Sequence, residues 1–335
     1  MTLSRYAANG CSVTLLILCM TIATAAQQDI ATLKQQAASG DVSAQYNLGL
    51  LYNFGRGVPQ DYAQAMAWFR KAAEQGNANA QNYLGMAYDF GEGIPPDHAQ
   101  AATWYRKAAE QGNADAQYSL GLLYGNGQGV RLDLKQAASW FRKAADQGNP
   151  NAQYFLGLAY DTGYGVKQNF TQANAWIRKA AEQGHAKAQY NLGLIYAHGR
   201  GVTLDYAQAA FWYSKAAEQG DSIAQDSLGF MYYKGRGVPQ DYVQAVSWYR
   251  KAAEQGNVDA QYAVAAAYAS GQGLPQDYAE ALFWLDLVAS GKSEGIKPED
   301  VAKEQDGVAS HLTPADLDHV QERVRRWLEY HQPQP

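Results

Sequence analysis

Cysteine is nearly absent from this 335-residue chain, and both of its cysteines, Cys11 and Cys19, fall within the first 26 residues. The remainder of the sequence therefore has neither disulfides nor cysteine-ligated zinc sites. The six histidines show no metal-binding spacing such as H-E-x-x-H. We accordingly predict no metal site and no cofactor.

Basic residues and catalytic motifs are also scarce. The 27 Lys and Arg residues are outnumbered by 32 acidic ones, and their dispersed placement offers no basic patch for nucleic acid. No S-x-x-K motif occurs. One G-x-S-x-G match, residues 291–295, follows a predicted helix rather than the strand that a nucleophile elbow requires. We therefore do not expect an enzyme.

The N-terminal apolar run is short. It covers residues 13–22, whereas a membrane-spanning helix needs about 20 residues. Arg5 precedes the run and the small residues 23–26 follow it, as in a secretory signal peptide cleaved near Ala26. Leu18 is too large for the residue before a lipidated cysteine, so Cys19 is not expected to carry a lipid anchor. The sequence predicts a periplasmic or secreted protein without a membrane span.

The sequence does have a 36-residue period. Tryptophan recurs at Trp68, Trp104, Trp140, Trp176, Trp212, Trp248 and Trp284. Alanine keeps the same step at Ala44, Ala80, Ala116, Ala152, Ala188, Ala224 and Ala260. A fixed period of this length indicates a solenoid, in which each unit buries its apolar face against its neighbours.

Each period predicts two helices. In residues 41–76 the first helix carries an apolar stripe and stops at Gly55. The second begins at Asp61, which together with Gln64 forms a capping-box pair; we expect each of these two side chains to satisfy a backbone N–H of the other residue. The same pairing occurs in all seven periods.

A glycine in the middle of each first helix indicates close packing. Gly49 and five equivalents cost about 1 kcal/mol each relative to alanine, and only the seventh period has Ala265 instead. We expect the helices to approach closely at these glycines, with the tryptophan filling the gap against the small residues.

The pattern A-x-A-Q-x-x-L-G-x-x-Y-x-x-G-x-G-V, continued by D-x-x-x-A-x-x-W-x-x-K-A-A-x-x-G, resembles the Sel1-like repeat, a relative of the tetratricopeptide repeat. The resemblance covers residues 41 to about 291. It implies an all-α fold, an α/α solenoid (superhelix) of seven helix-turn-helix repeats with terminal capping helices. The expected organisation is a signal peptide (1–26), an N-terminal capping half-repeat (27–40), seven repeats (41–292), and C-terminal capping helices with a disordered tail (293–335).

The resemblance also implies a protein–protein interaction scaffold that binds on its concave face, lined by the first helices. The candidate residues are Tyr46, Phe54, Phe90, Tyr118, Tyr154, Asp161, Tyr190, His198 and Tyr233. Packing of the tyrosines between successive first helices explains their recurrence equally well. We expect a monomer with a protein or peptide partner.

Two other functions are considered. A module that binds cell-wall glycan is the alternative, favoured if the tyrosine rows form an exposed, flat platform. A β-lactamase-like or other cell-envelope hydrolase ranks third. The family subgroup that suggests such an enzyme carries paired cysteines in its repeats, and these are missing here.

Overall fold

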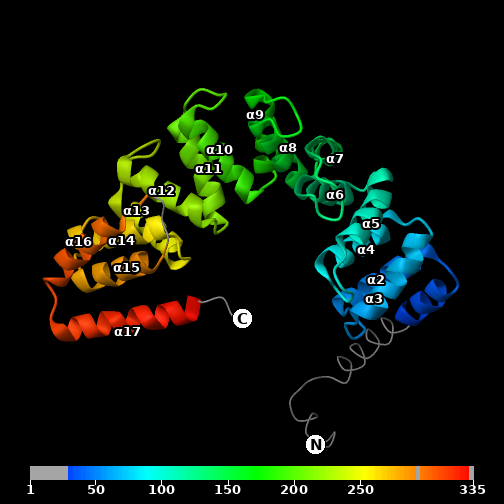
Figure 1. Cartoon of the computed structure of the whole chain (residues 1–335), viewed down its shortest axis with the longest axis horizontal. Coiled ribbons are helices and arrows are strands. Elements are labelled where there is room, and N and C mark those ends of the chain that lie inside the picture. Colours follow the sequence, from blue (N-terminus) through cyan, green and yellow to red (C-terminus); the bar gives the residue numbers. More distant parts are fainter. Residues whose placement is uncertain (1–28, 292–294, 332–335) are drawn as a thin grey trace, which may run out of the picture. The chain divides into compact units, whose positions relative to one another are not determined.

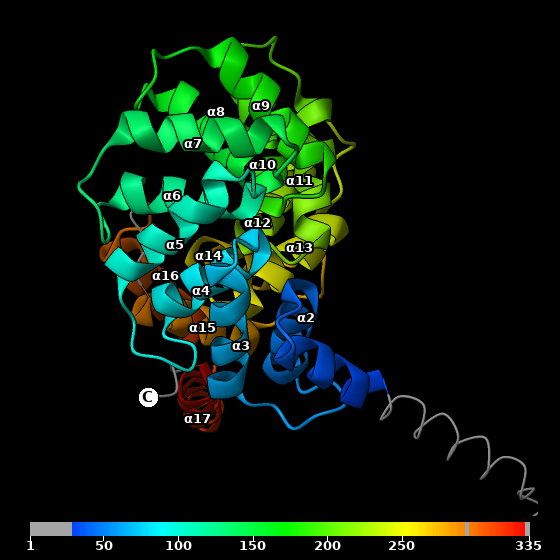
Figure 2. The ribbon, with the colours of Figure 1, turned by 90° about the vertical axis from the view of Figure 1, so that its right-hand side faces the viewer.

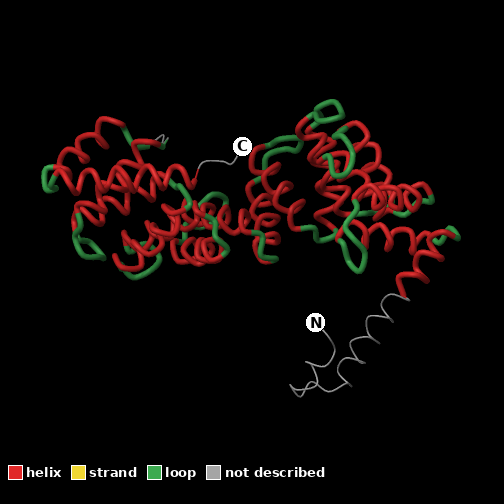
Figure 3. Tube along the Cα trace, turned by 90° about the horizontal axis from the view of Figure 1, so that it is seen from below, coloured by secondary structure: helices red, strands yellow, loops and turns green. Residues whose placement is uncertain are grey.

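The computed structural model describes residues 29–291 and 295–331, and this part of the chain contains helices and loops but no strand (Figures 1 and 3). Residues 29–38 are helical, and seven helix pairs follow. The first helices are α2 (Val42–Phe54), α4 (Ala78–Phe90), α6 (Ala114–Asn126), α8 (Pro150–Thr162), α10 (Ala186–His198), α12 (Ser222–Lys234) and α14 (Val258–Ser270). The second helices are α3 (Tyr62–Glu74), α5 (His98–Glu110), α7 (Leu134–Asp146), α9 (Phe170–Glu182), α11 (Tyr206–Glu218), α13 (Tyr242–Glu254) and α15 (Tyr278–Ser290).

The predicted all-α solenoid of seven 36-residue repeats is confirmed. Two further helices, α16 (Pro298–Ala309) and α17 (Pro314–His331), follow the seventh pair. The predicted signal peptide (1–26) and the end of the predicted disordered tail (332–335) lie outside the described residues.

The chain divides into two compact units. The first contains residues 29–155 and 163–167, and the second contains residues 156–162 and those from 168 onward. In the first unit, successive helices from α2 to α7 pack against one another. In the second, the same holds from α9 to α15, and both α16 and α17 pack against α15. Figure 2 shows the succession of helices within each unit from a second direction.

The start of each second helix differs in one respect from the prediction. Asp61 caps α3 as expected, since its Oδ1 accepts a hydrogen bond from the Gln64 N–H at 2.9 Å. Gln64 does not return the bond to the Asp61 backbone: its Nε2 donates to Asp61 Oδ2 at 3.1 Å. The Asp61 N–H instead donates to the Tyr52 carbonyl of α2 at 2.9 Å. The prediction of a reciprocal capping box is therefore wrong. The Tyr52 carbonyl lies at the end of the first helix, where carbonyls lack partners within the helix, and it accepts the hydrogen bond of the Asp61 N–H.

The close approach predicted at the mid-helix glycines is confirmed. A Cβ added to Gly49 would lie 2.6 Å from the ring of Phe69, and the other five repeats that carry this glycine have equally short contacts. The group on the glycine is not the tryptophan, however, but the residue after it. Trp104 instead packs against the core formed by α2, α3 and α4. The indole thus fills space between repeats, while its neighbour fills the space within a repeat.

A glutamine pair that was not predicted from the sequence links the helices of successive repeats. Gln81 Nε2 donates to the Ala73 carbonyl of the preceding repeat at 3.0 Å, and its Oε1 accepts from Gln111 Nε2 at 2.7 Å. Gln81 is buried. Because a buried amide needs partners for both its N–H and C=O groups, this recurring pair fixes the register between repeats.

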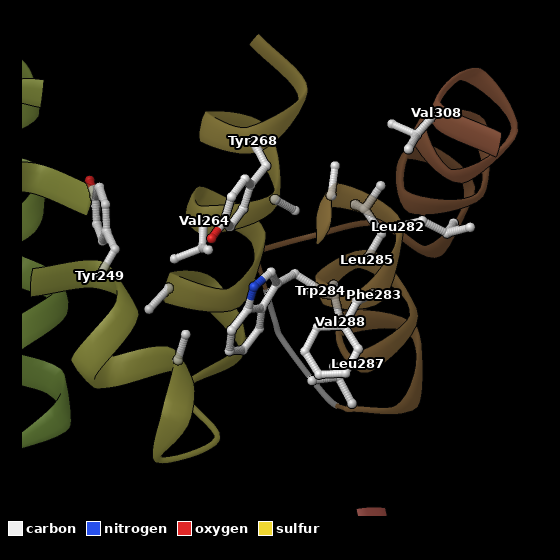
Figure 4. Packing of buried hydrophobic residues seen from close by; sticks show 14 of the residues in the cluster. Tyr249, Val264, Tyr268, Leu282, Phe283, Trp284, Leu285, Leu287, Val288 and Val308 are labelled. Atoms are coloured by element: carbon white, nitrogen blue, oxygen red, sulfur yellow. The ribbon is translucent and has the colours of Figure 1, made fainter. Parts of the chain in front are cut away.

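At the C-terminal end of the second unit, α13, α14, α15, α16 and α17 contribute buried side chains to one hydrophobic core. Figure 4 shows Trp284 of α15 directed toward α14, which carries Val264 and Tyr268. On the other side, α16 and α17 contribute the buried side chains Val308 and Val320. These two helices therefore cover apolar surface that the seventh repeat would otherwise expose.

Candidate interaction surface

The first helices of the second unit share one face that lines a set of hollows. In α12 this face carries Asp226, Ser227 and Phe230, and in α10 it carries Leu194 and His198. The spacing of three or four residues places such side chains next to one another on a helix.

Three hollows lie along this face. The first, of about 570 Å³, lies across α10, α12 and α14; the second, also of about 570 Å³, lies between α12 and α14; the third, of about 310 Å³, lies between the end of α8 and α10. Leu194 and His198 line both the third and the first hollow, and Phe230, Tyr249 and Ala263 line both the first and the second. The three hollows therefore adjoin one another along this face, and together they are called here the trough.

In the first unit, aromatic rings fill the space that corresponds to these hollows. Its Tyr83 ring stacks on Phe69 with the ring centroids 4.7 Å apart, and its Phe155 ring stacks on Phe141 at 5.4 Å. In repeats six and seven the residues equivalent to Tyr83 are Ser227 and Ala263. Small side chains at these two positions leave the room that an aromatic ring occupies elsewhere in the chain.

Buried tyrosines form the floor of the trough. Tyr213 and Tyr249 are both buried, and burial raises the pKa of each phenol above its usual value of 10.0. Both side chains therefore remain neutral at physiological pH. They offer a wide apolar surface with a polar tip, a combination favoured in binding sites.

The rim of the trough is cationic near Phe230, which is 40% exposed. The Arg236 guanidinium lies 5.5 Å from the centroid of the Tyr206 ring and 5.6 Å from that of the Phe230 ring. Lys234 Nζ lies 4.9 Å from the centroid of the Tyr233 ring. These cation–π contacts hold the basic groups at the C-terminal end of α12.

Two acidic residues lie farther along the same hollow. Asp226 of α12 and Asp259 of α14 both line it. Burial of the Asp226 carboxyl, reinforced by the like charge of Asp259, raises its pKa from 3.8 to about 6. This hollow is thus acidic near the N-terminal halves of α12 and α14 and basic just beyond the C-terminal end of α12.

Three of the nine residues predicted from sequence line the trough: Asp161, His198 and Tyr233. Asp161 forms an ion pair with Arg200, Oδ1 to Nε 3.3 Å, and Tyr233 packs against Tyr242 with the ring centroids 5.5 Å apart. Tyr190 lies in the second unit but is not among the lining residues. The other five residues lie in the first unit.

The tyrosine row packs between neighbouring helices. The Tyr46 ring is tilted by 44° against Phe69, the Tyr118 ring by 40° against Phe141, and Tyr154 is buried. Tilted, partly covered rings do not form the flat exposed platform on which the glycan alternative depended. Phe54 and Phe90, by contrast, are 51% and 68% exposed.

The residues that create the trough, above all Ser227, Tyr249 and Ala263, were not predicted from the sequence. A partial signal was present in the alignment of the repeats, because the position of Ser227 is a large aromatic residue in repeats two and four and a small one in repeats three, six and seven. No cluster of metal-ligating side chains occurs within residues 29–291 and 295–331.

Comparison with known proteins supports the repeat assignment. The Sel1 repeat family model matches seven consecutive segments: residues 42–77, 78–113, 114–149, 150–185, 186–221, 222–257 and 258–292. Among solved structures, the chain is similar to a Sel1 repeat protein from Oxalobacter formigenes, with 38% identity, coverage of 84% of this chain and 82% of that chain, and a TM-score of 0.67. It is also similar to c5321, a protective antigen present in uropathogenic Escherichia coli strains, with 31% identity, coverage of 90% and 79%, and a TM-score of 0.47. No curated protein matches the chain.

Proposed function

The chain belongs to the Sel1 repeat family, whose fold generally serves as a protein–protein interaction scaffold, and from this premise we propose that it is an exported scaffold that holds a segment of a partner protein in the trough. The observation that carries the proposal is the succession of three adjoining hollows from α8 to α14. Adjoining hollows with aromatic walls and polar groups at intervals suit a chain-like ligand with several side chains to place.

The proposal assigns partner binding to the second unit and no primary binding site to the first unit. Where Tyr83 and Phe155 stack on their neighbours, the equivalent space is already filled by the chain itself. The exposed Phe54 and Phe90 of the first unit are then secondary contacts at most.

Export is supported by the sequence of residues 1–26. In the described part of the chain, no helix combines the length and apolarity needed to cross a bilayer. N-terminal sequencing of the protein recovered from the periplasm or medium tests the proposal. We expect the mature chain to begin at Ala26 or Gln27; an unprocessed cytoplasmic chain would contradict export.

The binding proposal is tested by filling the trough with a ring that the chain already uses. Ser227→Tyr introduces at this position the residue that stands at Tyr83, facing Tyr190 and Tyr213 as Tyr83 faces Tyr46 and Phe69. We expect a partner captured from envelope extract by the native chain to be lost from this variant.

The matched control is Ser139→Tyr, the same exchange at an exposed position on α7. It should capture the partner normally, and circular dichroism should show both variants to be as helical as the native chain. Equal capture by Ser227→Tyr and the native chain would place the binding site elsewhere. Recovery of cell-wall fragments alone would favour the glycan alternative.

A further inference from the structure

The part of the trough above Tyr249 differs from its counterparts at two positions at once. Ala263 stands where repeat two has Tyr83, so the ring that covers Phe69 in the first unit has no equivalent above Tyr249. Asp226 stands where five other repeats have a tyrosine: Tyr46, Tyr118, Tyr154, Tyr190 and Tyr262. An aromatic floor and a carboxyl group therefore meet in a hollow of about 570 Å³.

The Asp226 carboxyl has no cationic partner in the described part of the chain. Within residues 29–291 and 295–331, burial and the charge of Asp259 shift the pKa of this carboxyl, and no hydrogen bond or ion pair contributes. Its charged neighbour on α14 is Asp259, which repels it, and the basic groups of the same hollow are Arg236 and His198. Arg236 is held on the rings of Tyr206 and Phe230 rather than on Asp226.

The space above Tyr249 corresponds to one that a flat ring fills in the first unit, which favours a flat group of the partner. In the first unit the corresponding floor, Phe69, is covered by a ring stacked at 4.7 Å with the planes 14° apart. A group that is flat, cationic and able to donate two parallel hydrogen bonds to a carboxylate is the guanidinium of arginine. Lysine supplies the charge without the plane, and an aromatic side chain supplies the plane without the charge.

We propose that this hollow receives an arginine side chain of the bound partner segment, with the guanidinium stacked on Tyr249 and paired with Asp226. The proposal rests on the proposed function, since it names one specificity pocket within the trough. The negative charge of Asp259, which repels that of Asp226, strengthens the preference for a cation, because both carboxylates gain from a positive charge between α12 and α14.

Methionine methyl resonances provide a direct test on the full chain. Met231 lines the hollow, whereas Met66 and Met86 lie in the first unit and serve as internal references. The probe is the peptide acetyl-Ser-Arg-Ser-amide, compared with the same peptide carrying citrulline or lysine. We expect the arginine peptide to shift the Met231 signal saturably, with the reference signals unchanged.

The variants assign the effect to the carboxyl group. Asp226→Asn should weaken binding of the arginine peptide by about tenfold or more, because one charge-assisted pair is lost. Asp146→Asn, which removes an exposed carboxylate of α7, should leave it unchanged. Asp226→Tyr restores the residue of five other repeats and should also abolish binding, which provides a second, independent variant.

Three results would overturn the proposal: no shift of Met231 with the arginine peptide, an equal shift in Asp226→Asn, or equal binding of the citrulline peptide. These results are separable from failure of the proposed function. If Ser227→Tyr abolishes partner capture while Asp226→Asn does not, the trough is the binding site and the arginine pocket is wrong. If neither variant affects capture, the trough itself is not the site.

Discussion

The pairing of each mid-helix glycine with the residue after the tryptophan yields a sharp prediction about stability. In repeat three the change is Gly121→Ala. The new Cβ would lie 2.6 Å from Phe141 Cε1 and 2.7 Å from Cδ1, about 1 Å closer than ordinary van der Waals contact. Phe141 is buried, and its ring is stacked on Phe155 at 5.4 Å, so it has little room to move.

Two opposing effects set the magnitude. Alanine gains about 1 kcal/mol over glycine inside a helix. Overpacking a rigid core costs about 1 to 3 kcal/mol. We therefore expect Gly121→Ala to lower the free energy of unfolding by up to about 2 kcal/mol. A matched control lies in the same helix: a Cβ on Gly125 would meet only Ala137 Cβ, at an ordinary 3.7 Å, so Gly125→Ala should be neutral or stabilising.

Repeat seven supplies the compensating change. It carries Ala265 in place of the glycine, and Leu285 in place of the ring. Adding Phe141→Leu to Gly121→Ala reproduces this pair in repeat three. We expect a favourable coupling energy of about 1 to 2 kcal/mol in the double-mutant cycle, measured by urea unfolding followed by circular dichroism. Additive effects of the two changes, or stabilisation by Gly121→Ala alone, would refute the packing argument.

Three further predictions concern charge, the glutamine pair and the C-terminal helices. Because the pKa of Asp226 is higher in the folded state, about 6, than the unfolded value of 3.8, ionisation of this group destabilises the fold as pH rises through that interval. At pH 7 the free energy of unfolding of Asp226→Asn, measured with urea, should therefore exceed that of the native chain by up to about 3 kcal/mol, and by less where water in the hollow screens the charge. No difference is expected below about pH 4, and a difference independent of pH would contradict this. Gln117→Leu removes the hydrogen bond to the Ala109 carbonyl, which keeps the Gly112 N–H, and the bond from Gln147 Nε2, which keeps a longer contact of 3.4 Å to the Lys143 carbonyl. The loss of these two bonds should lower the free energy of unfolding in urea by about 1 to 3 kcal/mol, and an unchanged midpoint would mean that the glutamine pair contributes nothing. Deletion of residues 296–335 removes α16 and α17 from the apolar surface of α15, so light scattering should show association of the truncated chain; a monodisperse monomer would show that the two helices do not protect the seventh repeat.

The fold could be predicted from the sequence because the same signals for helix starts and helix ends recur in all seven repeats. Each period carries a glycine at the end of the first helix and an N-cap at the start of the second, and these signals depend only on residues close together in the chain. The contacts of the repeat were less accessible. The N–H of Asp61 had two possible partners, and only the structure shows that the Tyr52 carbonyl is the one it uses.

The candidate site was predicted in part. His198 and Tyr233 were chosen because their positions vary between repeats, and both line the trough. Tyr46 and Tyr118 were chosen because tyrosine recurs, and recurrence reflects their packing against Phe69 and Phe141. Phe54 and Phe90 were also chosen because their positions vary, and they are exposed but lie in the first unit, outside the trough. Variation between repeats therefore indicated exposure, and recurrence indicated the core.

The sequence by itself determined the architecture of this protein, because helix ends, the apolar stripes and the 36-residue period are properties of residues close together in the chain. The tertiary structure decided where the trough lies. Whether Ser227 and Ala263 leave space depends on the rings of Tyr213 and Tyr249. These rings come from the second helices of the preceding repeats and contact the first helices only after the repeats have stacked. A hollow is a property of several side chains from different helices, and no single repeat contains the information that specifies it.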